Sequence, residues 1–410
     1  MISRFHRLAQ YLCLLIALAA GPGCLQATCS STDISCGSSG SSLLLAGFLL
    51  TLPCFTDYFG VIQPQRREYL SSTLRTQAAL GASATGTADS FASPITGGTK
   101  WNDMALAPNG KLYAVPHSET SIAELSPPPY TLTCFPSNTC GVNQFSAAAL
   151  APNGMIYGVP FNSSDIIRID PTTESVSLIP SPVGGTLNWQ GGVLAPNGKI
   201  YFIPFSATVI LVFDPATDTA TSIPSPLTSS FMWVGGVLAP NGKIYGIPIQ
   251  ADDFLESDPT TDTATTLPSP VIGGNKWSGG VLGPNGLIYG IPLGQDNILV
   301  FDPESGTSSL IPSGTTGVTN KWSDGVLAPD GIIYAIARNN DNLLLIDTTQ
   351  NTASLIPSGR TGINEKWGGG VLADNGKIYV IPRADDVVLK IDPKSVGSLC
   401  APILRSSYMN

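Results

Sequence analysis

Charged residues are scarce in this chain of 410 residues, since Asp, Glu, Lys and Arg together make up 12% of the sequence, against roughly 25% in an average protein. The formal net charge is −9, and no cluster of lysines and arginines is present. A phosphate backbone is bound through a basic face. The composition therefore excludes nucleic acids as partners and leaves solubility mainly to Ser, Thr, Asn and Gly.

Histidine is almost absent as well, since the chain has only His6 and His117. Gly-x-Ser-x-Gly, Ser-x-x-Lys and His-Glu-x-x-His motifs are also missing, and these would place a nucleophile or two metal ligands at a fixed spacing. No second cysteine pair or nearby histidine completes a zinc site. These absences argue against nucleophilic and zinc-dependent catalysis. We expect no cofactor, with a divalent metal ion as the alternative.

Long hydrophobic runs are lacking too, since no stretch reaches the ~20 apolar residues of a membrane helix. A short apolar run, residues 11–20, follows Arg4 and Arg7 and precedes small residues, which is typical of an export signal. We therefore assign residues 1–27 to a signal peptide. Cys24 stands where a lipoprotein signal places its acylated cysteine, so cleavage before Cys24 with lipidation and cleavage before Thr28 without it both remain open.

Eight cysteines are present, and export permits disulfides between them. Cys134 and Cys140 form the predicted pair, because the five residues between them include Pro136 and suit a tight covalent loop. The pairing of the other candidates stays open. They are Cys29, Cys36, Cys54 and Cys400.

One motif recurs along most of the chain, as in WVGGVLAPNGKIYGIP at residues 233–248. By subtraction, its seven copies begin 44 or 45 residues apart, and a fixed period of this length indicates a repeat architecture. The opening position holds all six tryptophans, which indicates a packing site used once per unit. The opening residues are Trp101, Phe145, Trp189, Trp233, Trp277, Trp322 and Trp367.

Each unit contains four short runs that are typical of β-strands. The first two are joined by an Asn-Gly or Asp-Gly turn, the third ends at Asp-Pro in five of the seven units, and the fourth leads to the next unit. Seven such units predict an all-β fold, a seven-bladed β-propeller of four-stranded antiparallel blades. We assign residues 28–87 to a short N-terminal segment, residues 88–403 to the propeller and residues 404–410 to a C-terminal tail.

Two segments compete for the outer strand of the last blade. Residues 88–100 match the pattern of residues 264–276, so they form a fourth strand that precedes the first complete unit. Residues 395–403 are the alternative. We favour closure by the N-terminal strand, because a strand left at an edge is prone to pair with other chains.

The repeat W-x-G-G-V-L-A-P-N-G-K-I-Y-G-I-P resembles the tandem repeat of exported bacterial β-propeller proteins, and its APNGKIYG core is similar to NHL-type and streptogramin-lyase-like propellers. This resemblance covers residues 88–403 and implies the propeller fold. Such lyases use a histidine on the channel face, a role that would fall to His117. Ala337 departs from the pattern because it replaces the repeat proline, and Ala373-Asp374 departs from it in the last unit.

The copies differ most just after the second strand. In a propeller, the Asn-Gly and Asp-Pro turns lie on one face, so these unlike residues lie on the other. We predict that this variable face, with the mouth of the central channel, binds a ligand, whereas the alternative is drift in unconstrained loops. The residues are His117, Phe161, Phe205, Ile249, Leu293, Arg338 and Arg383.

Two carboxylates add a candidate within the channel. Asp103 and Asp324 lie two positions after the opening aromatic, where other units have Gly or Ala, and they could bind a cation or a polyol. The Asp of each Asp-Pro turn is expected to cap its turn, because calcium needs six to eight converging oxygens.

These features predict a monomeric, exported propeller that binds an unidentified protein or glycan at the cell surface, at the outer membrane or in the periplasm. Its only membrane contact would be a lipid anchor. Two alternatives remain: a channel-face enzyme of lyase or lactonase type, which would use His117 or the channel carboxylates, and a structural or adhesive surface protein. We favour binding and assign no catalytic residue.

Overall fold

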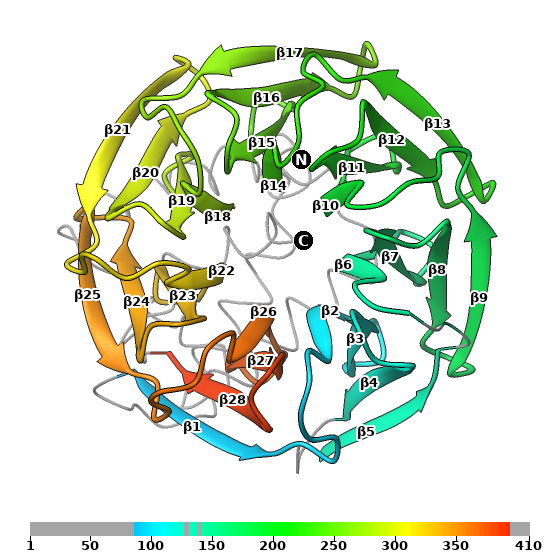
Figure 1. Cartoon of the computed structure of the whole chain (residues 1–410), viewed down its shortest axis with the longest axis horizontal. Helices are drawn as coiled ribbons and strands as arrows, with labels where there is room; N and C mark the ends of the chain where they lie inside the picture. Colours follow the sequence, from blue (N-terminus) through cyan, green and yellow to red (C-terminus); the bar gives the residue numbers. More distant parts are fainter. Residues whose placement is uncertain (1–85, 127–130, 138, 140, 394–410) are drawn as a thin grey trace, which may run out of the picture.

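Seven four-stranded antiparallel sheets stand around a common axis (Figure 1), so the predicted seven-bladed β-propeller is confirmed. The computed structural model describes residues 86–126, 131–137, 139 and 141–393. Within these ranges all regular elements are strands, and no helix there is long and apolar enough to cross a membrane. The predicted signal peptide, Cys24 and the C-terminal tail lie outside the described residues.

Each blade begins at the axis. Its innermost strand opens with the repeated aromatic residue, and the seven innermost strands are β2 (Trp101–Leu106), β6 (Phe145–Leu150), β10 (Trp189–Leu194), β14 (Trp233–Leu238), β18 (Trp277–Leu282), β22 (Trp322–Leu327) and β26 (Trp367–Leu372). The second strands are β3 (Leu112–Pro116), β7 (Ile156–Pro160), β11 (Ile200–Pro204), β15 (Ile244–Pro248), β19 (Ile288–Pro292), β23 (Ile332–Ala337) and β27 (Ile378–Pro382).

The remaining strands complete each blade outward. The third strands are β4 (Ser121–Ser126), β8 (Asp165–Asp170), β12 (Val209–Asp214), β16 (Asp253–Asp258), β20 (Asn297–Asp302), β24 (Asn342–Asp347) and β28 (Val387–Asp392). The outer strands are β5 (Thr131–Pro136), β9 (Ser175–Pro180), β13 (Thr219–Pro224), β17 (Thr263–Pro268), β21 (Thr307–Pro312), β25 (Thr352–Pro357) and β1 (Thr87–Ala92).

The last blade takes its outer strand from the beginning of the propeller. Strand β1 pairs antiparallel with β28, from Thr87 opposite Asp392 to Ala92 opposite Val387, and the sheet order is β1-β28-β27-β26. Figure 1 shows β1, in blue, beside β28, in red. The prediction that the N-terminal strand closes the propeller is therefore confirmed. Closure joins the first and last blades through backbone hydrogen bonds, so that β28 is not left as an edge.

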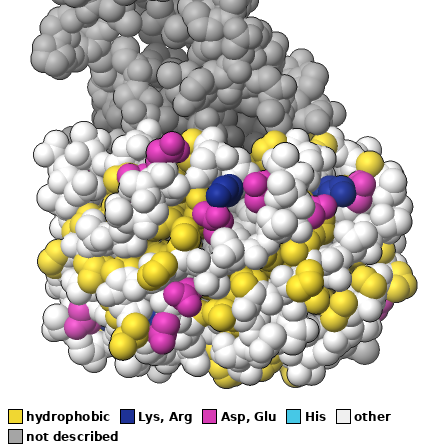
Figure 2. All heavy atoms as spheres, turned by 90° about the horizontal axis from the view of Figure 1, so that it is seen from above, with side chains coloured by type: hydrophobic (Ala, Val, Ile, Leu, Met, Phe, Trp, Pro, Cys, Tyr) yellow, Lys and Arg dark blue, Asp and Glu magenta, His cyan; other side chains and the backbone are white. Residues whose placement is uncertain are grey.

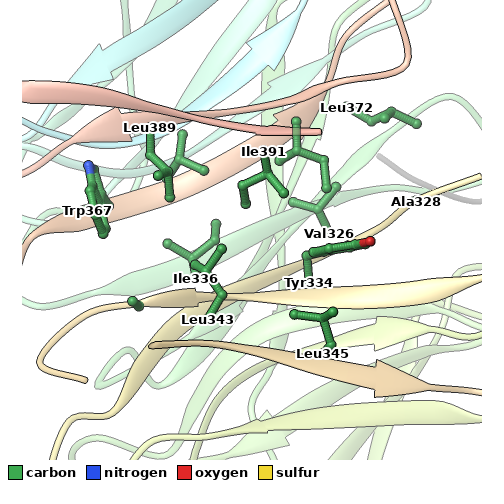
Figure 3. Close-up of a cluster of buried hydrophobic side chains, with 13 residues drawn as sticks. Val326, Ala328, Tyr334, Ile336, Leu343, Leu345, Trp367, Leu372, Leu389 and Ile391 are labelled. Carbon is green, nitrogen blue, oxygen red and sulfur yellow. The ribbon is translucent and has the colours of Figure 1, made fainter. Parts of the chain in front are cut away.

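The hydrophobic core lies between neighbouring blades. The cluster at the sixth and seventh blades joins Tyr334 and Ile336 of β23 with Trp367 of β26 and Leu389 of β28 (Figure 3). All six tryptophans are fully buried. Each indole N–H donates, at 2.8–3.1 Å, to the carbonyl oxygen of the first residue in the third strand of its own blade. Tryptophan thus fills the space between two blades and also satisfies a backbone group, as a buried aromatic with a polar N–H requires.

Glycines after the tryptophan let the innermost strands meet. A Cβ atom at Gly191 would lie 2.7 Å from the Cα atom of Gly235, and one at Gly235 would lie 3.2 Å from the Cα atom of Gly279. Pairing between the first two strands also shifts register here, as it does between Trp189 and Gly192. The repeated glycines therefore serve close backbone approach at the axis.

The face of the Asn-Gly turns is built by a repeated set of hydrogen bonds. The Asn285 side-chain amide donates to the Tyr289 hydroxyl at 2.9 Å and to the Thr348 carbonyl oxygen of the next blade at 3.0 Å. Equivalent bonds to the next blade start from Asn109, Asn153, Asn197 and Asn241. In the Asp-Pro turns the Asp side chain accepts a backbone N–H two residues on, as Asp258 does from Thr260 at 2.8 Å. The predicted turn-capping role is confirmed, and this face is scaffold.

The outer wall carries few charges. Figure 2 shows hydrophobic and uncharged polar groups over most of the wall, with few acidic and basic side chains between them. Leu178, Leu310 and Leu355 on the outer strands are 37–39% exposed. The low charge of the sequence is therefore also seen on the side of the wall that Figure 2 shows.

Candidate ligand-binding site

The seven unlike residues after the second strands come together around one end of the axis. Each second strand ends opposite the first residue of the innermost strand, as Pro248 does opposite Trp233, so the next residue, Ile249, lies beside the axis. Neighbouring blades bring these side chains into contact: the aromatic centroids of His117 and Phe161 are 6.2 Å apart, and those of Phe161 and Phe205 are 5.6 Å apart. We call this set the axial ring. It consists of His117, Phe161, Phe205, Ile249, Leu293, Arg338 and Arg383.

Blades two to five supply the apolar arc of the axial ring. Phe161, Phe205, Ile249 and Leu293 are each 4–8% exposed and share one hydrophobic cluster with Val234 of β14. Leu187 and Phe231, which are half-buried, pack against this cluster. The aromatic centroids of Phe205 and Phe231 are 5.0 Å apart in an edge-to-face arrangement, which is a favourable geometry for aromatic pairs.

Blades six and seven supply the charged arc. Arg338 donates to the Glu365 carboxylate at 2.5 Å, and the Nε atom of Arg383 lies 3.6 Å from the other carboxylate oxygen. Arg383 also donates to the side-chain oxygen of Asn102 on β2. Two guanidinium groups thus share a single carboxylate. Burial would raise the pKa of Glu365, but the hydrogen bond from Arg338 and the charges of both arginines hold it below its ordinary value.

His117 lies between the two arcs as a neutral imidazole. Its Nδ1 atom is 3.0 Å from the carbonyl oxygen of Phe145, which can only accept, so Nδ1 carries the proton and Nε2 is an acceptor. Nε2 lies 3.5 Å from a guanidinium nitrogen of Arg383. Burial, and then the positive charge of Arg383, lower the pKa of His117 to about 4.

A second set of residues, which sequence analysis did not single out, adjoins the axial ring. Two positions before the opening aromatic, the backbone has a φ of 52–58° in six blades. Asparagine adopts this left-handed conformation readily, whereas for larger side chains the conformation costs on the order of 1–3 kcal/mol of conformational free energy. The six residues are Asn143, Leu187, Phe231, Asn275, Asn320 and Glu365.

The three members of this set that are not asparagine are those that contact the axial ring. Leu187 and Phe231 extend the apolar arc, and Glu365 pairs with the arginines. Side chains of the preceding blade hold their backbone in place: the N–H of Leu187 donates to Asn162 at 2.8 Å, and that of Glu365 donates to Asn339 at 2.9 Å. Comparing the seven copies at this position would have revealed the three residues, because the local pattern favours asparagine.

Asp103 and Asp324 lie on the innermost strands β2 and β22, within electrostatic reach of each other. The two carboxylate oxygens of Asp103 accept backbone N–H groups of Met104 and Ala148 at 2.8 and 3.0 Å, and Asp324 accepts one from Gly325 at 2.7 Å. Burial and repulsion from Asp324 raise the pKa of Asp103 to about 8. Burial raises that of Asp324 to about 6.

This pair has the chemistry of a proton-holding site more than that of a metal site. Among the described residues, no group of three or more His, Cys, Asp or Glu side chains is placed to hold a metal ion. Calcium needs six to eight oxygen ligands, and two carboxyls supply too few of them. Two half-buried carboxyls that repel each other instead favour retention of one proton at neutral pH.

The cysteine prediction is not tested. Cys134 is half-buried on β5, and its predicted partner Cys140 lies outside the described residues. The Cys134–Cys140 disulfide therefore stays a prediction.

No protein family model matches the chain, and no curated protein matches it. Solved structures match its fold. A catalytically inactive virginiamycin B lyase from Staphylococcus aureus, solved with quinupristin, has a TM-score of 0.66 at 13% identity and covers 75% of this chain and 99% of its own. A streptogramin B lyase has a TM-score of 0.65 at 14% identity and covers 76% of this chain and 99% of its own.

A third similar structure is the extracellular domain of a putative hybrid two component system from B. thetaiotaomicron. Its TM-score is 0.60 at 12% identity, and the match covers 76% of this chain and 43% of that one. At such low identities the likeness shows the fold alone, the seven-bladed β-propeller.

Proposed function

We propose that the chain is an exported binding module that holds its ligand at the axial ring. The observation that carries this proposal is the division of seven equivalent positions into an apolar arc and an arginine arc, with His117 between them. Repeated positions elsewhere, such as the tryptophans and the turn asparagines, serve the scaffold in nearly every blade. The axial ring differs from blade to blade, and loops on a rigid scaffold are where binding residues are most often found.

An unbiased thermal-shift screen of the exported chain against glycans, metabolites and metal ions tests this proposal. We expect a ligand whose affinity falls at least about tenfold when Arg338→Gln, Arg383→Gln and Phe205→Ala are combined, because contacts in both arcs are lost. The matched control combines Arg168→Gln and Lys243→Gln, whose ion pairs lie away from the axial ring. A ligand that binds both variants as tightly as the unchanged chain would refute the proposed site.

A lyase or lactonase activity is the second candidate, and the place of His117, a neutral imidazole at the axial ring, is the observation that favours it. Its Nε2 atom would accept a proton from a substrate only if the Arg383 guanidinium moved away, and its lowered pKa makes it a weak base at neutral pH. Quinupristin, which is present in one similar structure, is a direct probe. A new product peak in liquid chromatography with the unchanged chain, lost in His117→Gln at unchanged Tm, would support this activity; an unchanged mass would indicate elimination, and a gain of one water would indicate hydrolysis. An intact probe would argue against it.

Location at the cell surface, at the outer membrane or in the periplasm belongs to the same proposal. It is supported by the N-terminal sequence pattern, and similar structures include extracellular domains. Lipidation at Cys24 would place the propeller on a membrane. Labelled palmitate on the unchanged chain but not on Cys24→Ser is the expected result, and equal labelling of both would rule out this anchor.

A further inference from the structure

We infer that the axial ring recognises an anionic amphiphile, a molecule in which a carboxylate, sulfonate or phosphate is joined to an aromatic or aliphatic body. This inference rests on the proposed function, since it names the class of ligand that the same site takes. Charge, hydrogen-bonding capacity and backbone conformation support it independently.

The charged arc has an excess of positive charge. Arg338 and Arg383 are 19% and 16% exposed, and Glu365 is the carboxylate that pairs with them. His117 is neutral and adds no charge. Nearby Lys100, Lys321 and Lys366 do not alter this balance, because each is paired with a loop carboxylate, Asp386, Asp296 or Asp341. An anion at this arc would neutralise a largely buried positive charge, whose isolation is costly.

The arginines also have unused hydrogen-bonding capacity. The Nε atoms of Arg338 and Arg383 are both buried without a hydrogen-bond partner. A guanidinium presents its donors in a planar fork that matches two oxygens of a carboxylate, sulfonate or phosphate. An oxyanion that displaced the contacts covering these buried atoms would gain an unpaired donor at Arg338, whereas at Arg383 it would compete with the Glu365 carboxylate at 3.6 Å.

The apolar arc faces the same end of the axis and suits the remainder of the ligand. Phe231 and Leu187 retain some exposure above the buried cluster of Phe161, Phe205 and Ile249. Aromatic and branched side chains next to a few polar groups are typical of small-molecule sites. A ligand with an anionic end and an apolar end would contact both arcs at once.

Backbone conformation marks the same residues. Leu187, Phe231 and Glu365 have φ values of 54–58°, at positions where other blades have asparagine. The scaffold has no need of these side chains there, because asparagine supports the same turn at lower backbone strain. Their presence beside the axial ring, apolar at one arc and acidic at the other, is explained by the contacts that they make with it.

Paired fluorescent probes test the inference on the exported chain: anilinonaphthalene sulfonate and the same anilinonaphthalene without its sulfonate group. We expect the sulfonate probe to bind about tenfold more tightly than the neutral one. Arg383→Gln should remove most of this preference and leave the affinity of the neutral probe unchanged. Phe231→Asn should weaken both probes several-fold without lowering Tm, because asparagine relieves the backbone. Arg168→Gln on β8 is the control and should change neither affinity.

Glu365→Gln provides a second, independent measurement. It removes the carboxylate that competes for the arginines, so the sulfonate probe should bind several-fold more tightly, and a loss of affinity would overturn the inference. Equal affinities for the two probes, both reduced in Phe231→Asn, would overturn the preference for anions while leaving the axial ring as a binding site. Probe binding that no axial-ring variant changes would overturn both proposals.

Discussion

His117 illustrates how a single position in a repeat becomes chemically distinct. Its backbone place is that of Phe161 in the next blade, but its imidazole donates to Phe145 and faces Arg383. Burial and the neighbouring guanidinium of Arg383 both disfavour a second positive charge. The residue therefore resists protonation even though nothing in its local sequence sets it apart.

The pKa of His117 can be measured by NMR titration of its imidazole signals. We expect a value of about 4 in the unchanged chain, because burial and Arg383 both disfavour the charged form. Arg383→Gln should raise the pKa toward the ordinary value of about 6.5, since it removes the larger of the two neighbouring positive charges that lower it. Phe231→Asn, which leaves the charges intact, is the control. A pKa near 6.5 in the unchanged chain would contradict the described geometry.

Contact between blades depends on the turns as well as on the core. The Asn-Gly turn of one blade and the third-to-fourth-strand turn of the next are joined by one side-chain amide, as Asn285 is to Thr348. Asp330 takes the asparagine position in the sixth blade, where it accepts from Tyr334 and caps its own turn. A carboxylate can replace the amide within the turn, but it has no N–H for the next blade.

Asn285→Asp isolates the hydrogen bond between the blades. The new carboxylate can still accept from the backbone N–H of Leu287, but it can donate neither to the Tyr289 hydroxyl nor to Thr348. The Thr348 carbonyl keeps the Tyr289 hydroxyl as a donor at 3.2 Å, so we expect the free energy of unfolding in urea to fall by about 1 kcal/mol, the net value of one hydrogen bond. Asp330→Asn restores the repeat residue and should change this free energy by less than about 0.5 kcal/mol. If the free energy of unfolding of Asn285→Asp equals that of the unchanged chain, the hydrogen bond between the blades adds no stability.

Closure of the propeller determines which distant groups interact. Strands β2 and β22 belong to the first and sixth blades, with only the last blade between them around the axis. Only in the closed arrangement do Asp103 and Asp324 repel each other. The folded state therefore holds a proton at pH values where the unfolded chain, with ordinary carboxyl groups, has released it.

Stability should consequently decrease as the pH rises from 6.5 to 8. In this window the folded chain binds more protons than the unfolded one, because the pKa of Asp103 is raised to about 8, so alkali favours unfolding. We expect a loss on the order of 1 kcal/mol, seen as a lower Tm at pH 8. His117 does not contribute to the change in stability between pH 6.5 and pH 8, since its lowered pKa destabilises the folded state only below about pH 6.5.

Asp324→Asn should flatten this dependence, because it removes the repulsion that helps to raise the pKa of Asp103. Asp302→Asn is the matched control. Its carboxylate caps an exposed turn and has a lowered pKa, so the variant should lower Tm equally at pH 6.5 and pH 8. Equal slopes in the unchanged chain and in Asp324→Asn would show that the two carboxyls do not interact.

The sequence alone predicted the seven blades, their strand order, the packing of tryptophan between blades and the closing strand. Each blade is a local unit, and its pattern recurs seven times along the chain. It also predicted which residues follow the second strands, and the closed circle placed them around one axis. These features depend on short-range pattern and on repetition, which a single sequence displays.

Tertiary structure alone decided the pairing of Arg338 and Arg383 with Glu365, the neutral state of His117 and the repulsion between Asp103 and Asp324. These depend on distances across blades and on burial, which no local pattern encodes. Comparing the seven copies would have singled out Leu187, Phe231 and Glu365, but only the tertiary structure shows their contacts with the axial ring. The sequence by itself determined the scaffold through repetition, whereas closure around the axis decided the chemistry, because electrostatic and packing energies depend on separation in space.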